Sequence, residues 1–131
     1  MTIRIVRLGS ERLSGEGVRI GTVRRPPRGV PKNEYTKRNI YDVWLPNLAP
    51  SETLLKSAQA DLSGADERSW KTFVRKYRAE MKTPERRALL DMLAVLSHRA
   101  DFSVGCYCAD ESRCHRSILR ALLTDHGASV E

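Results

Sequence analysis

The chain has 131 residues, of which 40% are hydrophobic and 30% are charged, and its formal net charge is +7 at pH 7. These values favour a globular chain of one domain that is large enough to bury a core. No apolar run approaches the roughly 20 residues that a membrane span needs, and the N-terminal residues lack the apolar stretch of a secretory signal. We therefore expect a cytoplasmic protein with no membrane partner.

The positive charge is concentrated near the N-terminus. Residues 1–40 hold ten Lys or Arg and three Asp or Glu, whereas residues 41–131 hold thirteen of each kind. Such a concentration favours an anionic partner, such as nucleic acid, a nucleotide or a phosphorylated metabolite. The alternative is a solubilising surface, to which Arg4, Arg7 and Arg19 would belong because they fall at alternating strand positions that would face water.

The first third of the chain reads as strands joined by a loop. Alternating apolar residues predict strands over residues 2–8 and 18–23. Residues 24–32 hold three prolines and a glycine, which exclude regular structure, together with four positive charges. The apolar segment 39–45 predicts a third strand or an extended segment that Pro46 ends.

The middle of the chain is helical in its pattern. Ser51 can cap a short helix that runs to about Lys56. Residues 66–81 carry an apolar stripe at the spacing of an amphipathic helix, and we expect its aromatic side chains to face the core. Thr83 and Pro84 are typical of the start of another helix.

The last third predicts a strand followed by a helix. Residues 102–108 form an uncharged run that is typical of a central strand. A helix then begins at Ser112 or a neighbour and ends before Gly127, and residues 128–131 are a candidate closing strand. This order predicts a single α/β domain over residues 1–131, with a small, mainly parallel sheet flanked by helices.

All three cysteines lie within residues 106–119. An odd number argues for reduced thiols and against a disulfide framework. A strand, a turn and a helix in this order belong at the carboxyl edge of a sheet, where α/β proteins bind ligands. The first turn of the helix favours an anion, with Arg113 and Arg116 beside it. The sequence therefore predicts a site for phosphate or carboxylate over residues 108–116.

Three residues of this stretch are candidates for catalysis. Cys108 ends the predicted strand and Cys114 lies in the first helical turn, both positions that can lower a thiol pKa. His115 is the candidate acid or base, because its ordinary pKa is near neutrality. Asp110 and Glu111 are candidates to orient it and to bind the ligand. The alternatives are core packing for the cysteines, a backbone hydrogen bond for the histidine and turn roles for the carboxylates.

We expect neither a metal nor another cofactor. On a helix, Cys114 and His115 would point about 100° apart and would not readily face one ion. The spacing also argues against a phosphatase-type loop, which needs five residues between its Cys and its Arg. Four residues separate Cys108 from Arg113, and six separate Cys106 from Arg113, so neither pair fits.

Three segments together resemble the family called domain of unknown function 488, in its shorter, YeaO-like branch. They are YDVWLPNLAPS over residues 41–51, WKTFVRKYRAEM over 70–81 and CYCADESRCHRSIL over 106–119. The resemblance implies one α/β domain with a small sheet flanked by helices, and it implies no established activity.

The family also has an Asp-Val-Arg turn after the second strand, followed by a Pro-Arg pair. Here Thr22-Val23-Arg24 and then Pro27-Arg28 are similar to it. The resemblance implies that Arg24 and Arg28 join Arg116 around one anion. Thr22 replaces the family's carboxylate, so a reaction that depends on that carboxylate would be absent here.

Three functions are consistent with these features, and they leave open whether the protein is an enzyme. The first is binding of a small anionic, phosphate- or nucleotide-like ligand at residues 108–116. The second is nucleic-acid binding through the basic segment 24–38. The third is thiol redox chemistry at Cys108 and Cys114.

Overall fold

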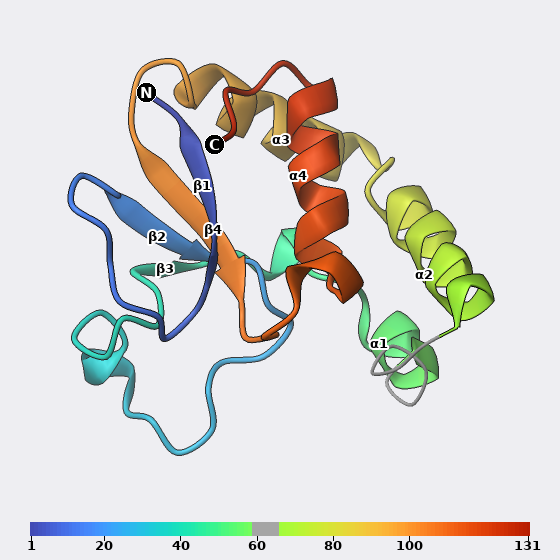
Figure 1. Ribbon diagram of the computed structural model, residues 1–131, viewed down its shortest axis with the longest axis horizontal. Helices are drawn as coiled ribbons and strands as arrows, with labels where there is room; N and C mark the ends of the chain where they lie inside the picture. The colour runs from blue at the N-terminus through green and yellow to red at the C-terminus, as the bar shows by residue number, and fades with distance from the viewer. Residues whose placement is uncertain (59–65) are drawn as a thin grey trace.

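The computed structural model describes residues 1–58 and 66–131. Within them, four parallel strands form one sheet in the order β1-β4-β2-β3, and Figure 1 shows the helices gathered on one side of it. The strands are β1 (Ile3–Arg7), β2 (Val18–Gly21), β3 (Val43–Trp44) and β4 (Phe102–Cys106). The helices are α1 (Glu52–Ala58), α2 (Glu67–Glu80), α3 (Pro84–Leu96) and α4 (His115–Asp125), with short 3-10 turns η1 (Lys32–Glu34), η2 (Pro46–Leu48) and η3 (Glu111–Arg113). The predicted small α/β fold with a parallel sheet is confirmed.

Strand β4 is the central strand, as its uncharged sequence predicted. It pairs with β1 on one side and with β2 on the other, and all five of its residues are buried. A Cβ atom on Gly105 would lie 2.5 Å from the carbonyl oxygen of Val6, so the close approach of β1 requires glycine here. The strand ends at Cys106, so Tyr107 and Cys108 begin the following loop instead of ending the strand.

Arg19 of β2 corrects a prediction, because its side chain is fully buried instead of facing water. Its Nε and Nη2 atoms donate to the two carboxylate oxygens of Glu16 at 2.8 and 2.9 Å. Its Nη1 donates to the carbonyl oxygens of Ser10 and Asn39, and the hydroxyl of Ser103 donates to Glu16. The alternating pattern was read correctly, but this face of the sheet is covered by irregular segments instead of water.

The predicted third strand is confirmed only at its end. β3 has two residues, and the preceding residues turn sharply, with Asn39 in the left-handed region at φ 61°. The ring of Tyr41 packs against Gly21, where an added Cβ would lie 2.3 Å from a ring carbon. Tertiary packing of this aromatic residue therefore replaces strand pairing over residues 39–42.

The predicted helix boundaries are confirmed for α1 and α2. The Ser51 hydroxyl accepts a hydrogen bond from the Leu54 N–H, and the Asp66 carboxylate accepts one from the Ser69 N–H. The expected stripe of α2 faces the core through Phe73 and Tyr77.

The C-terminal part of the chain differs from the prediction in detail. α3 begins at Pro84 as expected, with Thr83 as its N-cap residue. α4 begins at His115, later than predicted, and ends before Gly127, which has φ 93°. Val130 makes a single parallel bridge to Ile3 where a closing strand was expected.

The parallel strands place several loops at one end of the molecule. The carboxyl ends of β2 and β4, the segment that follows η2 and the beginning of α4 all lie there (Figure 1). Among the described residues, no helix combines the length and the apolar character needed to cross a membrane.

Candidate functional site

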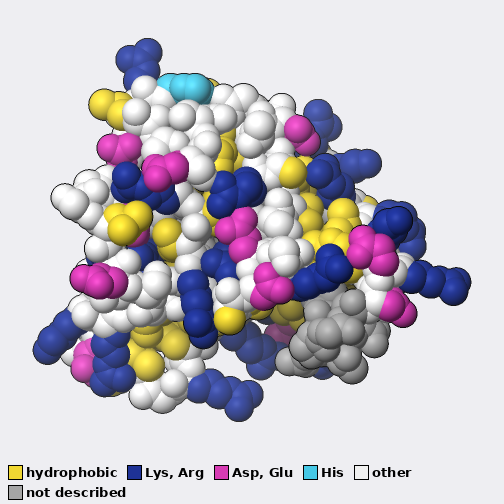
Figure 2. Space-filling model, viewed as in Figure 1, with side chains coloured by type: hydrophobic (Ala, Val, Ile, Leu, Met, Phe, Trp, Pro, Cys, Tyr) yellow, Lys and Arg dark blue, Asp and Glu magenta, His cyan; other side chains and the backbone are white. Residues whose placement is uncertain are grey.

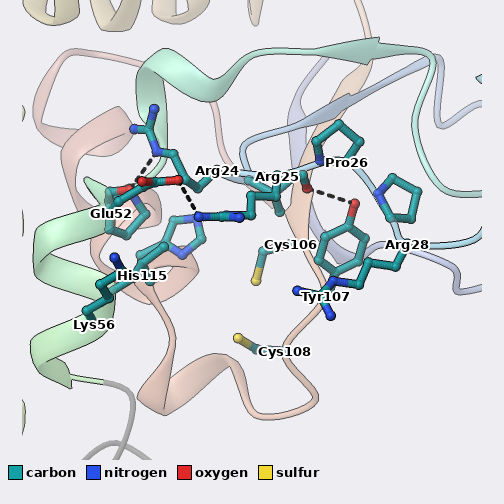
Figure 3. Close-up of a pocket in the computed structure, with 14 residues that line it drawn as sticks. Arg24, Arg25, Pro26, Arg28, Glu52, Lys56, Cys106, Tyr107, Cys108 and His115 are labelled. Carbon is teal, nitrogen blue, oxygen red and sulfur yellow. Dashed lines mark hydrogen bonds and ion pairs between the residues drawn. The ribbon is translucent and has the colours of Figure 1, made fainter.

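A pocket of about 710 Å³ opens at this carboxyl edge of the sheet. It is bounded by the loop after β2, the segment before and within α1, the loop after β4 and the first residue of α4 (Figure 3). Its charged lining residues are Arg24, Arg25, Arg28, Lys56 and Glu52. The wall therefore carries more positive than negative charge, and its volume is typical of a small-molecule site.

Arg24 is held by the backbone of the pocket wall. Its Nε donates to the carbonyl oxygen of Pro50 at 3.0 Å, and its Nη2 donates to those of Pro46 and Ala49 at 3.1 Å each. The carbonyl of Pro46 belongs to η2 and also accepts from the Ala49 N–H, whereas the carbonyls of Ala49 and Pro50 follow the turn. Arg24 thus joins the loop after β2 to the segment that leads into α1.

Arg25 and Arg28 extend from the same loop and are exposed. Arg25 donates to the carboxylate of Glu52 at 2.6 Å, as the dashed line in Figure 3 shows. Within the described residues Arg28 forms no ion pair, and neither does Lys56 on α1. Among the described residues, these two side chains are the pocket cations that have no ion-pair partner.

The loop between β4 and α4 brings all three cysteines together. Cys106 and Cys114 are buried, their sulfur atoms lie 2.8 Å apart, and Cys108 is exposed. Figure 3 shows the sulfurs of Cys106 and Cys108 facing the same space. Hydrogen bonds from the other two thiols lower the pKa of Cys108, and the charge of Arg116 adds to this effect.

Arg116 lies inside this loop and not in the pocket wall. It is 3% exposed, and its Nη2 donates to the carbonyl oxygen of Cys108 at 2.6 Å. In the part of the chain that the structure describes, its Nε is buried without a hydrogen-bond partner. The structure therefore does not bring Arg116 to the wall that Arg24 and Arg28 line, and its ligand-binding role stays a prediction.

Cys114 corrects the expected start of the last helix. It is the N-cap of α4, with an extended backbone at φ −129° and ψ 153°, and does not lie in the first helical turn. The 3-10 turn η3 occupies the residues where the helix was expected to begin. Because Cys114 is extended, its side chain can approach that of His115: its Sγ lies 3.7 Å from Nδ1.

His115 is buried and hydrogen-bonded to the backbone. Its Nε2 lies 2.7 Å from the carbonyl oxygen of Thr22 and donates to it, because a carbonyl can only accept. Burial lowers the pKa of His115 to about 4, so the ring is neutral near pH 7 instead of titrating there as the sequence suggested. Thr22, at the position where the resemblance implied a carboxylate, thus contributes its backbone oxygen to the site.

The other predicted residues of the turn make internal contacts. The Asp110 carboxylate accepts from the N–H and hydroxyl of Ser112. Glu111 pairs with Arg120 at 2.8 Å, so neither carboxylate orients His115. Arg113 pairs with Glu67 and lies over the ring of Trp70. None of the three lines the pocket, and their ligand-binding roles stay predictions.

Sequence reasoning missed Lys56, Arg25 and Tyr107 as pocket residues. Lys56 reaches the site because α1 lies beside the strand ends, which no local pattern indicates. Arg25 and Tyr107 each adjoin a predicted site residue, Arg24 and Cys108. Including the sequence neighbours of these two residues would have found them.

Basic residues elsewhere do not form one continuous patch on the face that Figure 2 shows. Lys and Arg side chains are spread over this face and are mixed with acidic ones. Basic and acidic side chains are also mixed in the segment 24–38, since its Arg38 pairs with Glu34 and its Arg25 pairs with Glu52.

The chain matches a protein-family model described as the Active DUF488-N3 subclade over residues 3–127. No curated protein and no solved structure matches the chain. The match spans the sheet, the described helices and the whole cysteine loop, and the chain therefore belongs to the DUF488 family.

Proposed function

We propose that the protein binds a small anionic ligand, phosphate- or nucleotide-like in its chemistry, in the pocket at the carboxyl edge of the sheet. The observation that carries this proposal is the lining of the pocket, in which four cationic side chains face a single carboxylate. Ligands of open α/β sheets bind at this edge. The proposal includes a cytoplasmic location. The three free cysteines are consistent with the reducing environment of the cytoplasm.

Arg28 and Lys56 are the residues that we expect to contact the ligand. Both are exposed at the pocket, from opposite walls built by the loop after β2 and by α1. Arg24 positions these two walls through its three carbonyl contacts. Tyr107 and Leu55 add apolar surface on which the non-ionic part of such a ligand can pack. A bound group would lie beside Cys108, whose catalytic role, like that of His115, stays a prediction.

Nucleic-acid binding by the basic segment is the less favoured candidate. Of the six cations over residues 24–38, Arg24 is used by carbonyl groups, and Arg25 and Arg38 are used by carboxylates. A binding site built from the remaining surface cations would depend on all of them about equally, because phosphate contacts of this kind act through charge.

The test compares Arg28→Ala with a matched control, Lys32→Ala, which removes one charge from the same segment outside the pocket. The probes are inorganic phosphate, pyrophosphate and a nucleoside diphosphate, screened by thermal shift and then titrated by calorimetry. Loss of one charge-assisted hydrogen bond predicts a Kd that is at least about tenfold weaker in Arg28→Ala. Lys32→Ala should bind like the wild type.

Two outcomes would contradict pocket binding. One is the absence of any saturable binding of the three probes to the wild-type protein. The other is duplex DNA binding that weakens equally in Arg28→Ala and Lys32→Ala and falls steeply with salt, which would favour the nucleic-acid candidate.

A further inference from the structure

The cysteine loop contains a cluster of metal-ligand atoms that anion binding does not use. The Sγ atoms of Cys106 and Cys114 and a ring nitrogen of His115 all lie within 4.8 Å of one another. Each of the three residues is at most 7% exposed. The fold fixes their positions, since Cys106 ends the central strand, Cys114 is the N-cap residue of α4 and His115 is the first residue of that helix. Metal sites are built from such converging, preoriented side chains.

The hydrogen bond that His115 makes through Nε2 leaves its Nδ1 free to bind a metal ion. Because Nε2 carries the proton that is donated to Thr22, Nδ1 has an unprotonated lone pair, and Cys114 Sγ is 3.7 Å from it. A backbone carbonyl that holds the far nitrogen is the partner that metal-bound imidazoles characteristically have, because it sets both the tautomer and the ring orientation.

The distance between Cys114 Sγ and His115 Nδ1 agrees with that of two ligands of a tetrahedral ion, whereas the distance between the two sulfur atoms is too short and would have to increase. Zinc bonds of about 2.3 Å to sulfur and about 2.0 Å to nitrogen separate the S and N ligands by about 3.6 Å, and two S ligands by about 3.8 Å. The observed Cys114–His115 separation is 3.7 Å, and the Cys106–Cys114 separation is 2.8 Å. The two thiols must therefore move apart by about 1 Å when they lose their protons and take up an ion.

We propose that Cys106, Cys114 and His115 bind one divalent zinc-class metal ion through two thiolates and Nδ1. Thiolate sulfur selects zinc over the hard ions that prefer oxygen, and two thiolates balance the charge of the ion. Cys106 and His115 both line the pocket, so the fourth coordination position faces it. A three-ligand site with one open position is the arrangement of catalytic zinc. The objection that Cys114 and His115 diverge on a helix does not apply, because Cys114 is an extended N-cap residue.

The test is a titration of the reduced, metal-free protein with Co²⁺, which reports tetrahedral thiolate ligation by its absorption bands. The three thiols are counted first, so that a disulfide between Cys106 and Cys114 is not mistaken for an empty site. We expect one equivalent of Co²⁺ to produce sulfur-to-metal charge-transfer and tetrahedral ligand-field bands, and Zn²⁺ to abolish them. Cys114→Ser should weaken Co²⁺ binding by more than about 100-fold, because even changes outside the ligand set cost 10–100-fold.

Cys108→Ser is the matched control, because it removes an exposed thiol of the same loop that is not one of the three ligands. It should keep one equivalent of Co²⁺ and the charge-transfer intensity of two thiolates, and circular dichroism should confirm that both variants are folded. Absence of these bands from the fully reduced wild type would overturn the site. An equal loss in Cys108→Ser and Cys114→Ser would overturn the three-ligand assignment. Neither result bears on phosphate binding by Arg28, which is measured separately.

Discussion

The buried ion pair of Arg19 and Glu16 shows how one side chain can organise a face of the sheet. The guanidinium group contacts the Glu16 carboxylate, the carbonyl of Ser10 and the carbonyl of Asn39, so that two irregular segments, the one before β2 and the one around Asn39, are held against β2. Both side chains are almost completely removed from solvent. An uncompensated charge in such a place is strongly unfavourable, whereas the intact pair is close to neutral in its net effect.

Arg19→Met should therefore lower the free energy of unfolding by about 3–5 kcal/mol, because it leaves the Glu16 carboxylate buried without its cation. Glu16→Leu combined with Arg19→Met removes both charges and should cost less than the single change. Arg38→Met, at an exposed pair with Glu34, is the control and should cost at most about 1 kcal/mol. Urea unfolding followed by circular dichroism measures all three, and equal losses in Arg19→Met and Arg38→Met would refute this account.

Helix α2 contacts the turn η2, and η2 in turn contacts Arg24 of the pocket wall. Tyr77 of α2 is fully buried, and its hydroxyl donates to the carbonyl oxygen of Leu48 at 2.6 Å. Pro46 of η2 and the two residues after the turn accept the hydrogen bonds of Arg24. The position of the pocket wall thus depends on a contact between α2 and η2 that lies behind it.

Tyr77→Phe should lower the free energy of unfolding by about 1–3 kcal/mol, because the buried carbonyl of Leu48 loses its donor. Tyr107→Phe is the matched control: its hydroxyl lies 3.4 Å from the carbonyl oxygen of Arg25 and is exposed, so the cost should be below about 0.5 kcal/mol. Thermal and urea unfolding of the two variants give the comparison. A loss in Tyr107→Phe as large as that in Tyr77→Phe would show that the buried contact has no special importance.

Across the whole molecule, the features that could be predicted are those whose causes lie close together in the sequence. The cap at Ser51, the apolar stripe of α2 and the stop at Gly127 each depend on neighbours within one or two helical turns, and all three are confirmed. The contact of Arg19 with Asn39 and the tautomer of His115 depend on partners from other segments of the chain. Thr22, for example, is 93 residues from the histidine that it orients. No periodicity reports such contacts, which is why the sequence could indicate the carboxyl edge of the sheet as a candidate region but not the contacts that these side chains make.

The stability of the whole molecule should depend on pH through two carboxylates on the face of the sheet that the helices leave free. Burial raises the pKa of Glu16 and of Asp42, but hydrogen bonds outweigh it and hold both below their ordinary values of 4.5 and 3.8. The donors to Glu16 include the Arg19 guanidinium, and those to Asp42 include the Arg12 guanidinium and the Arg19 N–H.

A lowered pKa in the folded state means that the unfolded chain binds protons first as the pH falls. The stabilising contribution of these groups is therefore complete above about pH 5 and is lost as the pH falls through the folded-state pKa values. The urea midpoint of the wild type should decrease below that pH, and it should decrease less steeply in the variant with Glu16→Leu and Arg19→Met, in which one of the two carboxylates is absent. Unfolding curves at a series of pH values between 7 and 2 measure both slopes. Parallel curves for the two proteins would show that Glu16 is not one of the groups that link folding to protonation.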